Sequence, residues 1–594
     1  MPRTPPHALL LLILLLACPG LARAAATIDK VHVQGVEDEL MVENINVALS
    51  LNDVLGDRLG ESRLEYLLNE AEAQTREALE PFGYYTPTIT VDAQRSGAAE
   101  DEHVTVVIRV DIGEPVRVRR SSISIDGEGH DDRYLKEDLA AFAPRVGEVF
   151  DHTTYEASKL KIVRRLADRG YFDADFTQRK VEVTRAEHAA DVDLAWVSGI
   201  RYDMGPTTFH QTYFVDGLLD KLVYWEEGSY FHQGKLDRLR ESLLGLDYFA
   251  NIDIQANPDK AVDGQVPIDV NLSLAKRTLY TAGVSYGSES GPGIRLGLDR
   301  RYINSRGHKL STQLDYATKR KILTSQYRIP AFKWLDGWYA LGVQASDEQT
   351  DYIDLRHVEF FASRSGQVTE DWTAIASLHT LRERWAYYEG SDVIDPYSYR
   401  YATFTYPQLK ADYLNAPVGS NRPDKLAGSV ILRGGVEGVG SDASFVQLHM
   451  RARWSRDFGR YSALIFRGEL GHTFTNALVD MPPSLRFFAG GDGSIRGYAW
   501  REVGPRDGDY ALGAKNVVTA SAEYEYYPQG GEFGGAVFVD TGSAFDKDLP
   551  DLSTGVGIGF RWRSPVGPVR LDIAHGLNDP DSQFQIYLNI GTSL

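Results

Sequence analysis

Cysteine is almost absent from this sequence, with one residue, Cys18, among 594. It lies in an N-terminal segment that has the features of a secretion signal: Arg3, an apolar run at residues 8–17 and the sequence Ala22-Arg23-Ala24. We therefore expect residues 1–24 to be a signal peptide that is removed on export. Lipidation at Cys18 is disfavoured because a cleavage site follows it. The exported chain would then contain no cysteine, which excludes disulfides and thiol chemistry.

Long hydrophobic runs are also missing beyond residue 25, where no stretch of about 18 apolar residues could form a membrane-spanning helix. An exported chain of this kind is periplasmic, secreted, or a closed barrel in a membrane, since other folds leave backbone groups unsatisfied in lipid. Basic residues are outnumbered as well, with 63 Lys and Arg against 83 Asp and Glu and a formal net charge of -20. This balance disfavours a nucleic-acid binder, which would present a basic face.

Residues 26–277 contain a pattern that occurs three times. Each unit ends its helical region at an aromatic pair, and the pairs are Tyr84-Tyr85, Tyr171-Phe172 and Tyr248-Phe249. The residues just before them are 87 positions apart (83 to 170) and then 77 apart (170 to 247). Each unit has the order strand, helix, helix, strand, strand, which predicts a small sheet with two helices on one face. Three unrelated α+β domains are the alternative.

From Thr278 onward, helical periodicity gives way to strict alternation. In VTASAEYEY (residues 518–526), apolar residues alternate with Thr519, Ser521, Glu523 and Glu525. Charges at every second position do not fit a buried sandwich core, but they suit a barrel with lipid outside and water inside. Residues 278–594 number 317, which at about 20 residues per strand predicts roughly 16 antiparallel strands. A soluble sandwich or propeller is the alternative.

Three short motifs match sequence patterns of catalytic or ligand-binding sites. Each lacks the neighbouring residues or secondary structure that such a site requires. Residues 283–287 match the G-x-S-x-G of hydrolases, but no helix follows to form a nucleophile elbow. Residues 126–132 (DGEGHDD) lack the ligand spacing of a calcium or zinc site and are expected to form a solvated turn. Residues 490–500 (GGDGSIRGYAW) are glycine-rich but lack the G-K-[ST] of a phosphate loop. We therefore expect no catalytic residue, no metal and no cofactor, and hence no enzyme.

One group of residues in the last quarter of the chain has complementary charges. A guanidinium on a long loop can bind a carboxylate of the inner barrel wall through two hydrogen bonds. On spacing alone, such a pairing and an exposed loop-tip charge are equally open. The loop motif is Ile495-Arg496-Gly497-Tyr498, and the wall residues are Glu523, Phe538, Asp540 and Gly542.

These motifs resemble those of the POTRA–barrel outer-membrane assembly superfamily, which includes BamA and TamA. The loop motif is similar to its [V/I]-R-G-[F/Y] sequence, and residues 538–542 are similar to its F-x-D-x-G strand. Residues 564–572 resemble its penultimate strand. The resemblance implies that the loop folds into the lumen and that Arg496 docks on Asp540. Phe538 would pack nearby, and Glu523 would be a further acidic position on the wall.

The resemblance also implies the domain organisation. The three units would be POTRA domains of order β-α-α-β-β, which receive extended clients by adding a strand at a sheet edge. Three such units match the TamA-like branch, because BamA-like chains carry five and two-partner transporters carry two after a plug helix. The expected boundaries are 1–24 for the signal peptide, 25–114, 115–200 and 201–277 for the POTRA domains, and 278–594 for a 16-stranded transmembrane β-barrel.

The function implied is that of an assembly factor in the outer membrane with periplasmic POTRA domains. It would insert or secrete β-rich clients such as unfolded outer-membrane proteins and autotransporters through a seam between the first strand (278–287) and the last (584–594). Its short hydrophobic girdle would thin the outer-membrane lipid, and an inner-membrane-anchored TamB-like protein would be its partner.

Two other functions stay open from the sequence. A two-partner secretion transporter is disfavoured, because the segment before TIDKVHV leaves no room for a plug helix. A passive porin is disfavoured by the three N-terminal units and the loop motif. The final Ser593-Leu594 departs from the phenylalanine common at the end of outer-membrane barrels, which leaves recognition of the last strand open.

Overall fold

The computed structural model contains two compact units, made of residues 1–206, 225–236 and 256–268 and of residues 207–224, 237–255 and 269–594. The predicted signal peptide, Cys18 and Ser593-Leu594 lie outside the described residues. In the part of the chain that is described, no helix is long and apolar enough to cross a membrane. The described residues are 25–98, 101–332, 337–350, 352–387, 399–415, 424–507, 510–547, 549–565, 567–578 and 584–590.

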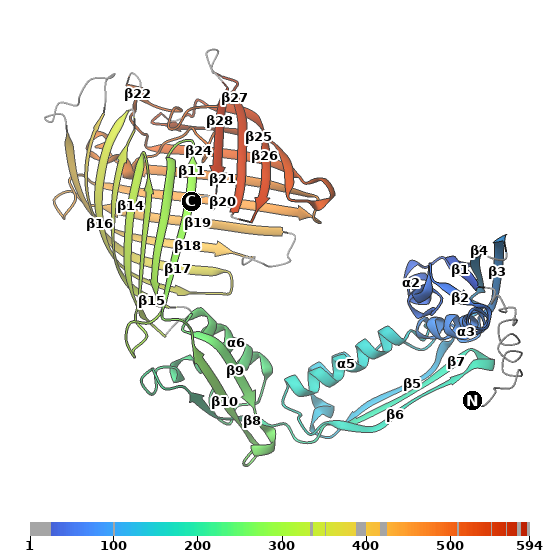
Figure 1. Cartoon of the computed structure of the whole chain (residues 1–594). Coiled ribbons are helices and arrows are strands. Elements are labelled where there is room, and N and C mark those ends of the chain that lie inside the picture. Colours follow the sequence, from blue (N-terminus) through green and yellow to red (C-terminus); the bar gives the residue numbers. More distant parts are fainter. Residues whose placement is uncertain are drawn as a thin grey trace, which may run out of the picture. The chain divides into compact units, whose positions relative to one another are not determined.

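The first N-terminal module is a four-stranded sheet with two helices (Figure 1). The strand order is β2-β1-β4-β3, with β1 and β4 parallel. Apolar residues recur at helical spacing along α3, so Leu64, Leu67 and Ala71 face the sheet and are buried. Its elements are β1 (Ala25–Gln34), α2 (Glu39–Ala48), β2 (Arg58–Gly60), α3 (Glu61–Leu79), β3 (Thr88–Ala98) and β4 (Asp101–Asp111).

The second module repeats this plan with the strand order β5-β7-β6. Alternate residues of β7, from Ala190 to Trp196, are buried against α5. The DGEGHDD segment forms the turn before α4, and Asp132 caps that helix by accepting a hydrogen bond from the Tyr134 amide at 3.0 Å. Its elements are β5 (Arg117–Asp126), α4 (Arg133–Ala140), α5 (His152–Asp168), β6 (Asp175–Thr184) and β7 (Ala189–Val197).

The third module departs from the expected plan. Only the short 3-10 helix Asp220–Leu222 stands where the first of two helices was predicted, so that prediction is wrong. The reason is local, because Gly217 and Gly228 adopt positive φ angles of 77° and 79°. Turns of this kind end a helix. The remaining elements form a sheet of order β8-β10-β9 and are β8 (Asp203–His210), α6 (Gln233–Gly245), β9 (Phe249–Ala256) and β10 (Gln265–Leu274).

The three aromatic pairs found in the sequence each contact the domain that follows. The Tyr85 hydroxyl lies 2.5 Å from Nε2 of His152, at the start of α5. The ring of Phe172 lies 4.8 Å from that of Phe231, before α6. Tyr248 donates a hydrogen bond to the carbonyl of Gly307, in the connection between the second and third strands of the barrel. The repeated aromatic residues therefore form joints between consecutive domains.

The C-terminal half is a closed barrel of sixteen strands in which neighbours are antiparallel, as predicted (Figure 1). The strands are β11 (Thr278–Gly287), β12 (Gly291–Arg300), β13 (Lys309–Ala317), β14 (Arg320–Pro330), β15 (Trp338–Gln349), β16 (Ile353–Gln367), β17 (Trp372–Tyr387), β18 (Arg400–Leu414), β19 (Asp424–Gly435), β20 (Phe445–Phe458), β21 (Ser462–Phe474), β24 (Asn516–Tyr526), β25 (Phe533–Phe545), β26 (Ser553–Ser564), β27 (Gly567–Gly576) and β28 (Gln585–Ile590).

Burial in the barrel is the reverse of that in a soluble protein. Val446 and Ile558 are 49% and 63% exposed, whereas Gln447 and Asp540 are fully buried. Apolar residues thus form the outer surface, and polar residues point into the lumen. This distribution is stable only where the outer surface faces lipid.

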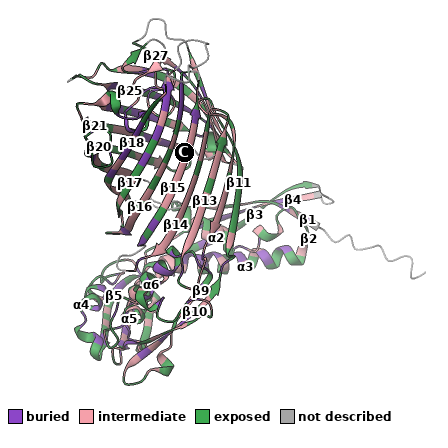
Figure 2. Cartoon of the chain, turned by 90° about the vertical axis from the view of Figure 1, so that its left-hand side faces the viewer, coloured by how far each residue is buried: buried purple, intermediate pink, exposed green. Residues whose placement is uncertain are grey.

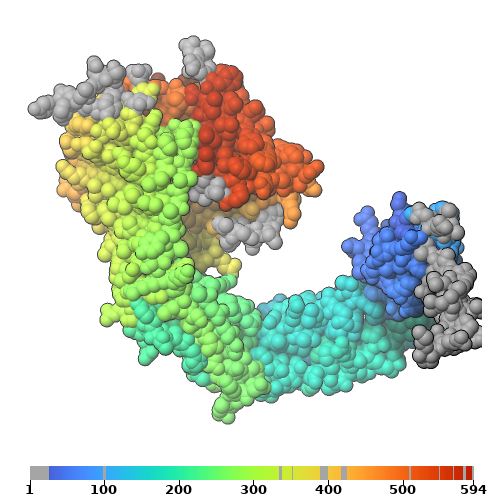
Figure 3. Space-filling model, in the orientation of Figure 1, coloured from blue at the N-terminus to red at the C-terminus, as the bar shows by residue number. Residues whose placement is uncertain are grey.

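The barrel closes between β11 and β28. Within the described residues, two pairs join these strands, Tyr286 with Ile590 and Gly287 with Asn589, whereas ten pairs join β11 to β12. The surfaces of β11 (green) and of the last strands (red) meet along this seam in Figure 3. The G-x-S-x-G sequence lies inside β11, so it forms no nucleophile elbow.

The segment between β21 and β24, residues 475–515, folds into the lumen. It contains the short hairpin of β22 (Arg506–Asp507) and β23 (Tyr510–Ala511). We call this segment the lumen loop. Its residues Met481 and Leu485 pack against inward-facing aromatic side chains such as Trp385 and Phe404. These belong to the buried positions, purple in Figure 2, that recur along β17 and β18.

Candidate functional site

The lumen loop is fixed to several strands before it reaches its arginine motif. The Ser484 amide donates to the Glu383 carboxylate of β17 at 3.2 Å, and Gln447 of β20 donates to the Leu485 carbonyl at 2.8 Å. Within the loop, the Arg486 guanidinium donates to the carbonyls of Met481 and Leu512 at 2.6 and 2.7 Å. Residues 484–486 are therefore held in place before the chain reaches the motif at residues 495–498.

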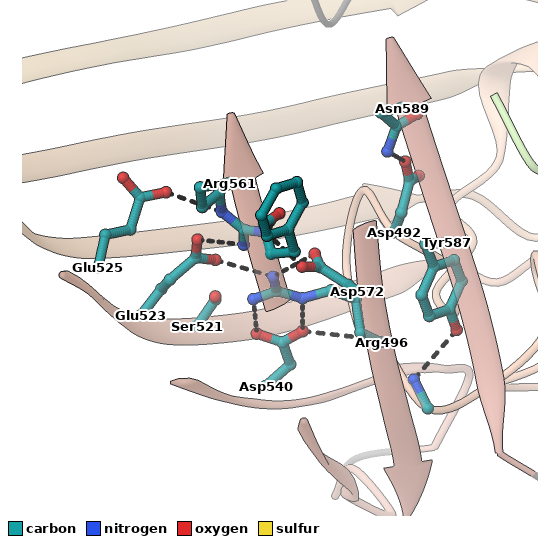
Figure 4. A network of polar contacts seen from close by, with 12 residues as sticks. Asp492, Arg496, Ser521, Glu523, Glu525, Asp540, Arg561, Asp572, Tyr587 and Asn589 are labelled. Atoms are coloured by element: carbon teal, nitrogen blue, oxygen red, sulfur yellow. Dashed lines mark hydrogen bonds and ion pairs between the residues drawn. The ribbon is translucent and has the colours of Figure 1, made fainter. Parts of the chain in front are cut away.

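Arg496 and Asp540 form the centre of the site (Figure 4). Nε of Arg496 donates to Oδ2 of Asp540 at 2.7 Å, and Nη2 donates to Oδ1 at 3.0 Å. The backbone amide of Arg496 also donates to Oδ2 at 3.0 Å. Arg496 is 2% exposed, so water is excluded from this bidentate ion pair. The exclusion of water strengthens the attraction between the two charges.

The remaining donor of Arg496 reaches two further carboxylates. Nη1 lies 2.8 Å from Glu523 of β24 and 3.0 Å from Asp572 of β27. Arg561 of β26 also binds Glu523, with Nη2 at 2.6 Å, and Asp572. Its Nε lies 2.9 Å from a fourth carboxylate, Glu525. Two guanidinium groups and four carboxylates thus tie the loop to four consecutive strands.

An aromatic ring and two glycines bring the loop close to the wall. The central guanidinium carbon of Arg496 lies 3.3 Å from the centre of the Phe538 ring, which is a cation–π contact. Gly497 has φ +102°, and a Cβ there would meet the His575 carbonyl carbon at 2.7 Å. A Cβ on Gly555 of β26 would meet the Arg496 carbonyl oxygen at 1.8 Å. Side chains at either glycine would push the loop off the wall.

Tyr587 joins the motif to the last strand. The Gly497 amide donates to the Tyr587 hydroxyl at 3.0 Å, and that hydroxyl donates to the Tyr498 carbonyl at 2.6 Å. The Tyr498 hydroxyl in turn donates to the Thr554 carbonyl of β26 at 3.3 Å. Ile495 is fully buried in an apolar cluster with Tyr498. Every residue of the loop motif therefore contacts the interior of the barrel.

The structure brings seven of the eight sequence-derived residues together around Arg496. The exception is Gly542, whose close neighbours belong to β24: a Cβ there would meet the Val518 carbonyl oxygen at 2.3 Å. Sequence reasoning missed Arg561, Asp572 and Tyr587. Each lies on the polar side of an alternating strand, which is the signal that could have identified it.

A cavity of about 1100 Å³ remains beside the lumen loop. Its wall carries charges of both signs, including Arg453, Arg467, Glu469 and Asp492. In the ranges that the structure describes, no group of three or more His, Cys, Asp or Glu side chains could hold a metal ion. The chemistry of the network itself is to hold the loop, since its carboxylates are engaged by guanidinium groups.

The class of protein is defined by three features: a closed barrel with an apolar exterior, a lumen loop fixed by an arginine, and α+β modules before the barrel. These are the features of outer-membrane barrels that carry POTRA domains. Family models agree with this assignment. Residues 303–594 match the Omp85 superfamily domain, residues 30–112 match POTRA domain TamA domain 1, and residues 118–195 match the POTRA surface antigen variable number repeat. The chain belongs to the Omp85 superfamily and carries TamA-type POTRA domains, which lie in the periplasm.

Two relatives illustrate the similarity. The outer membrane protein assembly factor BamA of Nitratidesulfovibrio vulgaris (strain Hildenborough) is 24% identical over 591 residues, covering 93% of this chain and 71% of that protein. The crystal structure of BamA from Haemophilus ducreyi lacking POTRA domains 1-3 superposes with a TM-score of 0.65 at 18% identity, covering 80% of this chain and 99% of that one. The protein is thus an Omp85-family outer-membrane assembly or secretion factor, a family of assembly and transport proteins rather than enzymes.

Proposed function

We propose that this protein inserts or secretes β-rich clients, such as autotransporters, through the seam between β11 and β28. The observation that carries this proposal is the exposure of β11, the first strand of the barrel, where it meets the last strand. Within the described residues, β11 and β28 pair at Tyr286 with Ile590 and at Gly287 with Asn589.

The side chains of β11 support the same proposal. Tyr280 and Val284 are 73% and 78% exposed, and most positions of the strand are exposed on both faces. A long exposed edge strand templates pairing with other chains, and closed barrels normally remove such edges. A client strand that pairs with β11 would satisfy its backbone groups before it enters the hydrocarbon region.

The N-terminal modules supply further edges for an extended client. Strands β3, β6 and β9 each lie at one end of their sheet. Addition of a client strand at such an edge gives affinity through main-chain hydrogen bonds with little demand on sequence. The first module matches a TamA-type POTRA domain, which supports the further proposal of a TamB-like, inner-membrane-anchored partner.

The proposal is tested by locking the seam. Purified chain carrying Tyr286→Cys and Ile590→Cys, which are paired across the seam, is placed in liposomes with a urea-denatured autotransporter. Client insertion is measured by heat-modifiable mobility and protease protection. We expect oxidation to abolish insertion and reduction to restore it, because the seam cannot open while the disulfide is intact.

The matched control is Ala282→Cys with Leu296→Cys, which pair between β11 and β12 inside the wall. That disulfide should leave insertion intact. Full insertion by the oxidised seam variant would overturn the proposal. Delivery of an exoprotein across the membrane through a locked barrel would instead favour a two-partner secretion transporter.

A further inference from the structure

One residue of the lumen loop, Asp492, contacts the turn that follows β11 and the last strand, β28. The backbone amide of Asp492 donates to Oε1 of Glu289 at 3.0 Å, and Glu289 lies in the turn between β11 and β12. The carboxylate of Asp492 accepts a hydrogen bond from Nδ2 of Asn589, in β28, at 2.6 Å. Figure 4 shows Asp492 facing Asn589, next to Tyr587 on the same strand.

The contact lies beside the described pairing of β11 with β28. Asn589 pairs with Gly287, the last residue of β11 before the turn. The adjacent Leu588 amide donates to the Ser288 hydroxyl at 2.8 Å. Loss of the Asp492 contacts would therefore remove side-chain hydrogen bonds that join this turn to β28.

We propose that Asp492 is a clasp on the seam, which it closes by holding Glu289 in the turn after β11 and Asn589 in β28. The clasp is separate from the Arg496 network, which fixes the loop to β24–β27. Its existence does not depend on which clients the protein handles. Only the link between clasp release and client entry rests on the proposed function.

The surroundings of Glu289 explain why a proton is held there. Burial and the neighbouring negative charge of Asp492 raise the pKa of Glu289 from 4.5 to about 8, against smaller opposing effects of the Asp492 backbone amide, which donates to Glu289, and of Arg501. A protonated Glu289 donates to Asp492, whereas two ionised carboxylates repel each other. The other charged or titratable groups that face this space are Tyr587 of β28 and the cavity-lining Lys319, Arg320, Glu348 and Arg570.

The direction of the pH effect follows from the raised pKa. Between about pH 4.5 and pH 8 the closed clasp binds more protons than the open one, so its stability falls as the pH rises through this range. The clasp is firmest at acidic pH and loosest above pH 8. Each pH unit inside the range changes the open-to-closed ratio by up to tenfold.

Two neighbouring glycines provide a matched pair of variants. Gly491 has φ +99°, and a Cβ there would meet Oε1 of Glu289 at 2.2 Å, so Gly491→Ala displaces the acid pair. Gly493 is two residues away, and a Cβ there meets no atom within 4 Å. Gly493→Ala changes the same loop by the same methyl group without touching the clasp.

The test measures the seam directly, without a client. Spin labels on Val284→Cys and Ile586→Cys, both on the outer surface, report the distance between β11 and β28 in the full chain in liposomes at pH 6 and pH 9.5. We expect one short distance at pH 6 and, at pH 9.5, a rise of at least about tenfold in the ratio of long to short distances.

The variants distinguish loss of the Asp492 contacts from destabilisation of the whole barrel. Asp492→Ala and Gly491→Ala should give the long distance at both pH values, and Gly493→Ala should behave as the parent. Glu289→Gln should keep the short distance at both, because an amide donates to Asp492 without titrating. An unchanged seam in Asp492→Ala, or a parental pH response in Glu289→Gln, would overturn the inference. Heat-modifiable mobility identifies any variant that fails to fold, and failure of client insertion alone would leave the clasp standing.

Discussion

At the scale of the residue, Arg496 is the most heavily engaged side chain of the lumen. It donates to Asp540, Glu523 and Asp572, all of which are buried. Removing the guanidinium leaves these carboxylates facing one another with Arg561 as the nearest full counter-charge. Breaking a buried ion pair by removing one partner costs about 3–5 kcal/mol, because the remaining charge is uncompensated.

We therefore expect Arg496→Ala to lower the temperature of the heat-modifiable transition of the barrel on gels and to weaken client insertion. Arg451→Ala is the matched control, since Arg451 pairs with Glu469 at 3.0 Å on the same inner surface but is largely exposed. Exchanging the partners, Arg496→Asp with Asp540→Arg, should not rescue stability. The new aspartate would lie beside Glu523 and Asp572, and the Arg496 amide would lose its acceptor. A parental transition temperature in Arg496→Ala would contradict this account.

At the scale of the element, the aromatic joints connect each module to the next part of the chain. Tyr248 is fully buried, its hydroxyl donates to the Gly307 carbonyl, and its ring stacks on Phe214 at 4.8 Å. The joint thus fixes the start of β9 to the connection between β12 and β13.

The hydroxyl of Tyr248 can be removed without removing its ring. Tyr248→Phe leaves the Gly307 carbonyl without its donor, which costs about 1–3 kcal/mol locally. We expect faster trypsin cleavage after Arg306, the exposed arginine of that connection, with the barrel still folded. Tyr280→Phe, at an exposed position of β11, is the control and should cleave at the parental rate. Equal cleavage of both variants would show that the joint does not depend on this hydrogen bond.

At the scale of the whole molecule, the lumen loop decides what can pass through the barrel. It contacts β17, β20, β25 and β28, so it extends across the interior rather than along one wall. A passive porin needs an open, water-filled lumen. The loop therefore separates the two functions in a way that conductance can measure.

Replacing residues 480–510 by a short Gly-Ser linker should convert small, unsteady currents across a lipid bilayer into a large, steady pore. The reason is that the linker lacks the apolar and charged residues that hold the loop inside. Gly493→Ala should leave the current as it is, because that position has free space around it. A large, steady conductance in the parent chain would favour the porin instead.

Much of this architecture follows from local sequence pattern. Alternation placed the barrel and its first strand at Thr278, and the resemblance of the loop and strand motifs to a known family placed Arg496 near the inner wall. The first helix expected in the third module came from the order of elements assigned to all three units, and that order does not show that Gly217 and Gly228 form turns in this copy. The contact of Asp492 with Glu289 joins residues 203 positions apart, and no periodicity carries such information. Strand alternation places Arg561 and Tyr587 on the lumen side of the barrel. Their hydrogen-bond partners depend on how the lumen loop folds, which alternation does not predict.

The contacts around Asp492 also set the order in which the barrel can be completed. The Leu588 and Ser288 contact closes a chain segment of 300 residues, and such long closures carry a large entropic cost and form late. Asp492 cannot hold Glu289 and Asn589 until both have arrived, whatever the state of the strands between them. Its two hydrogen bonds can therefore form only after the C-terminal strand has reached the first turn of the barrel.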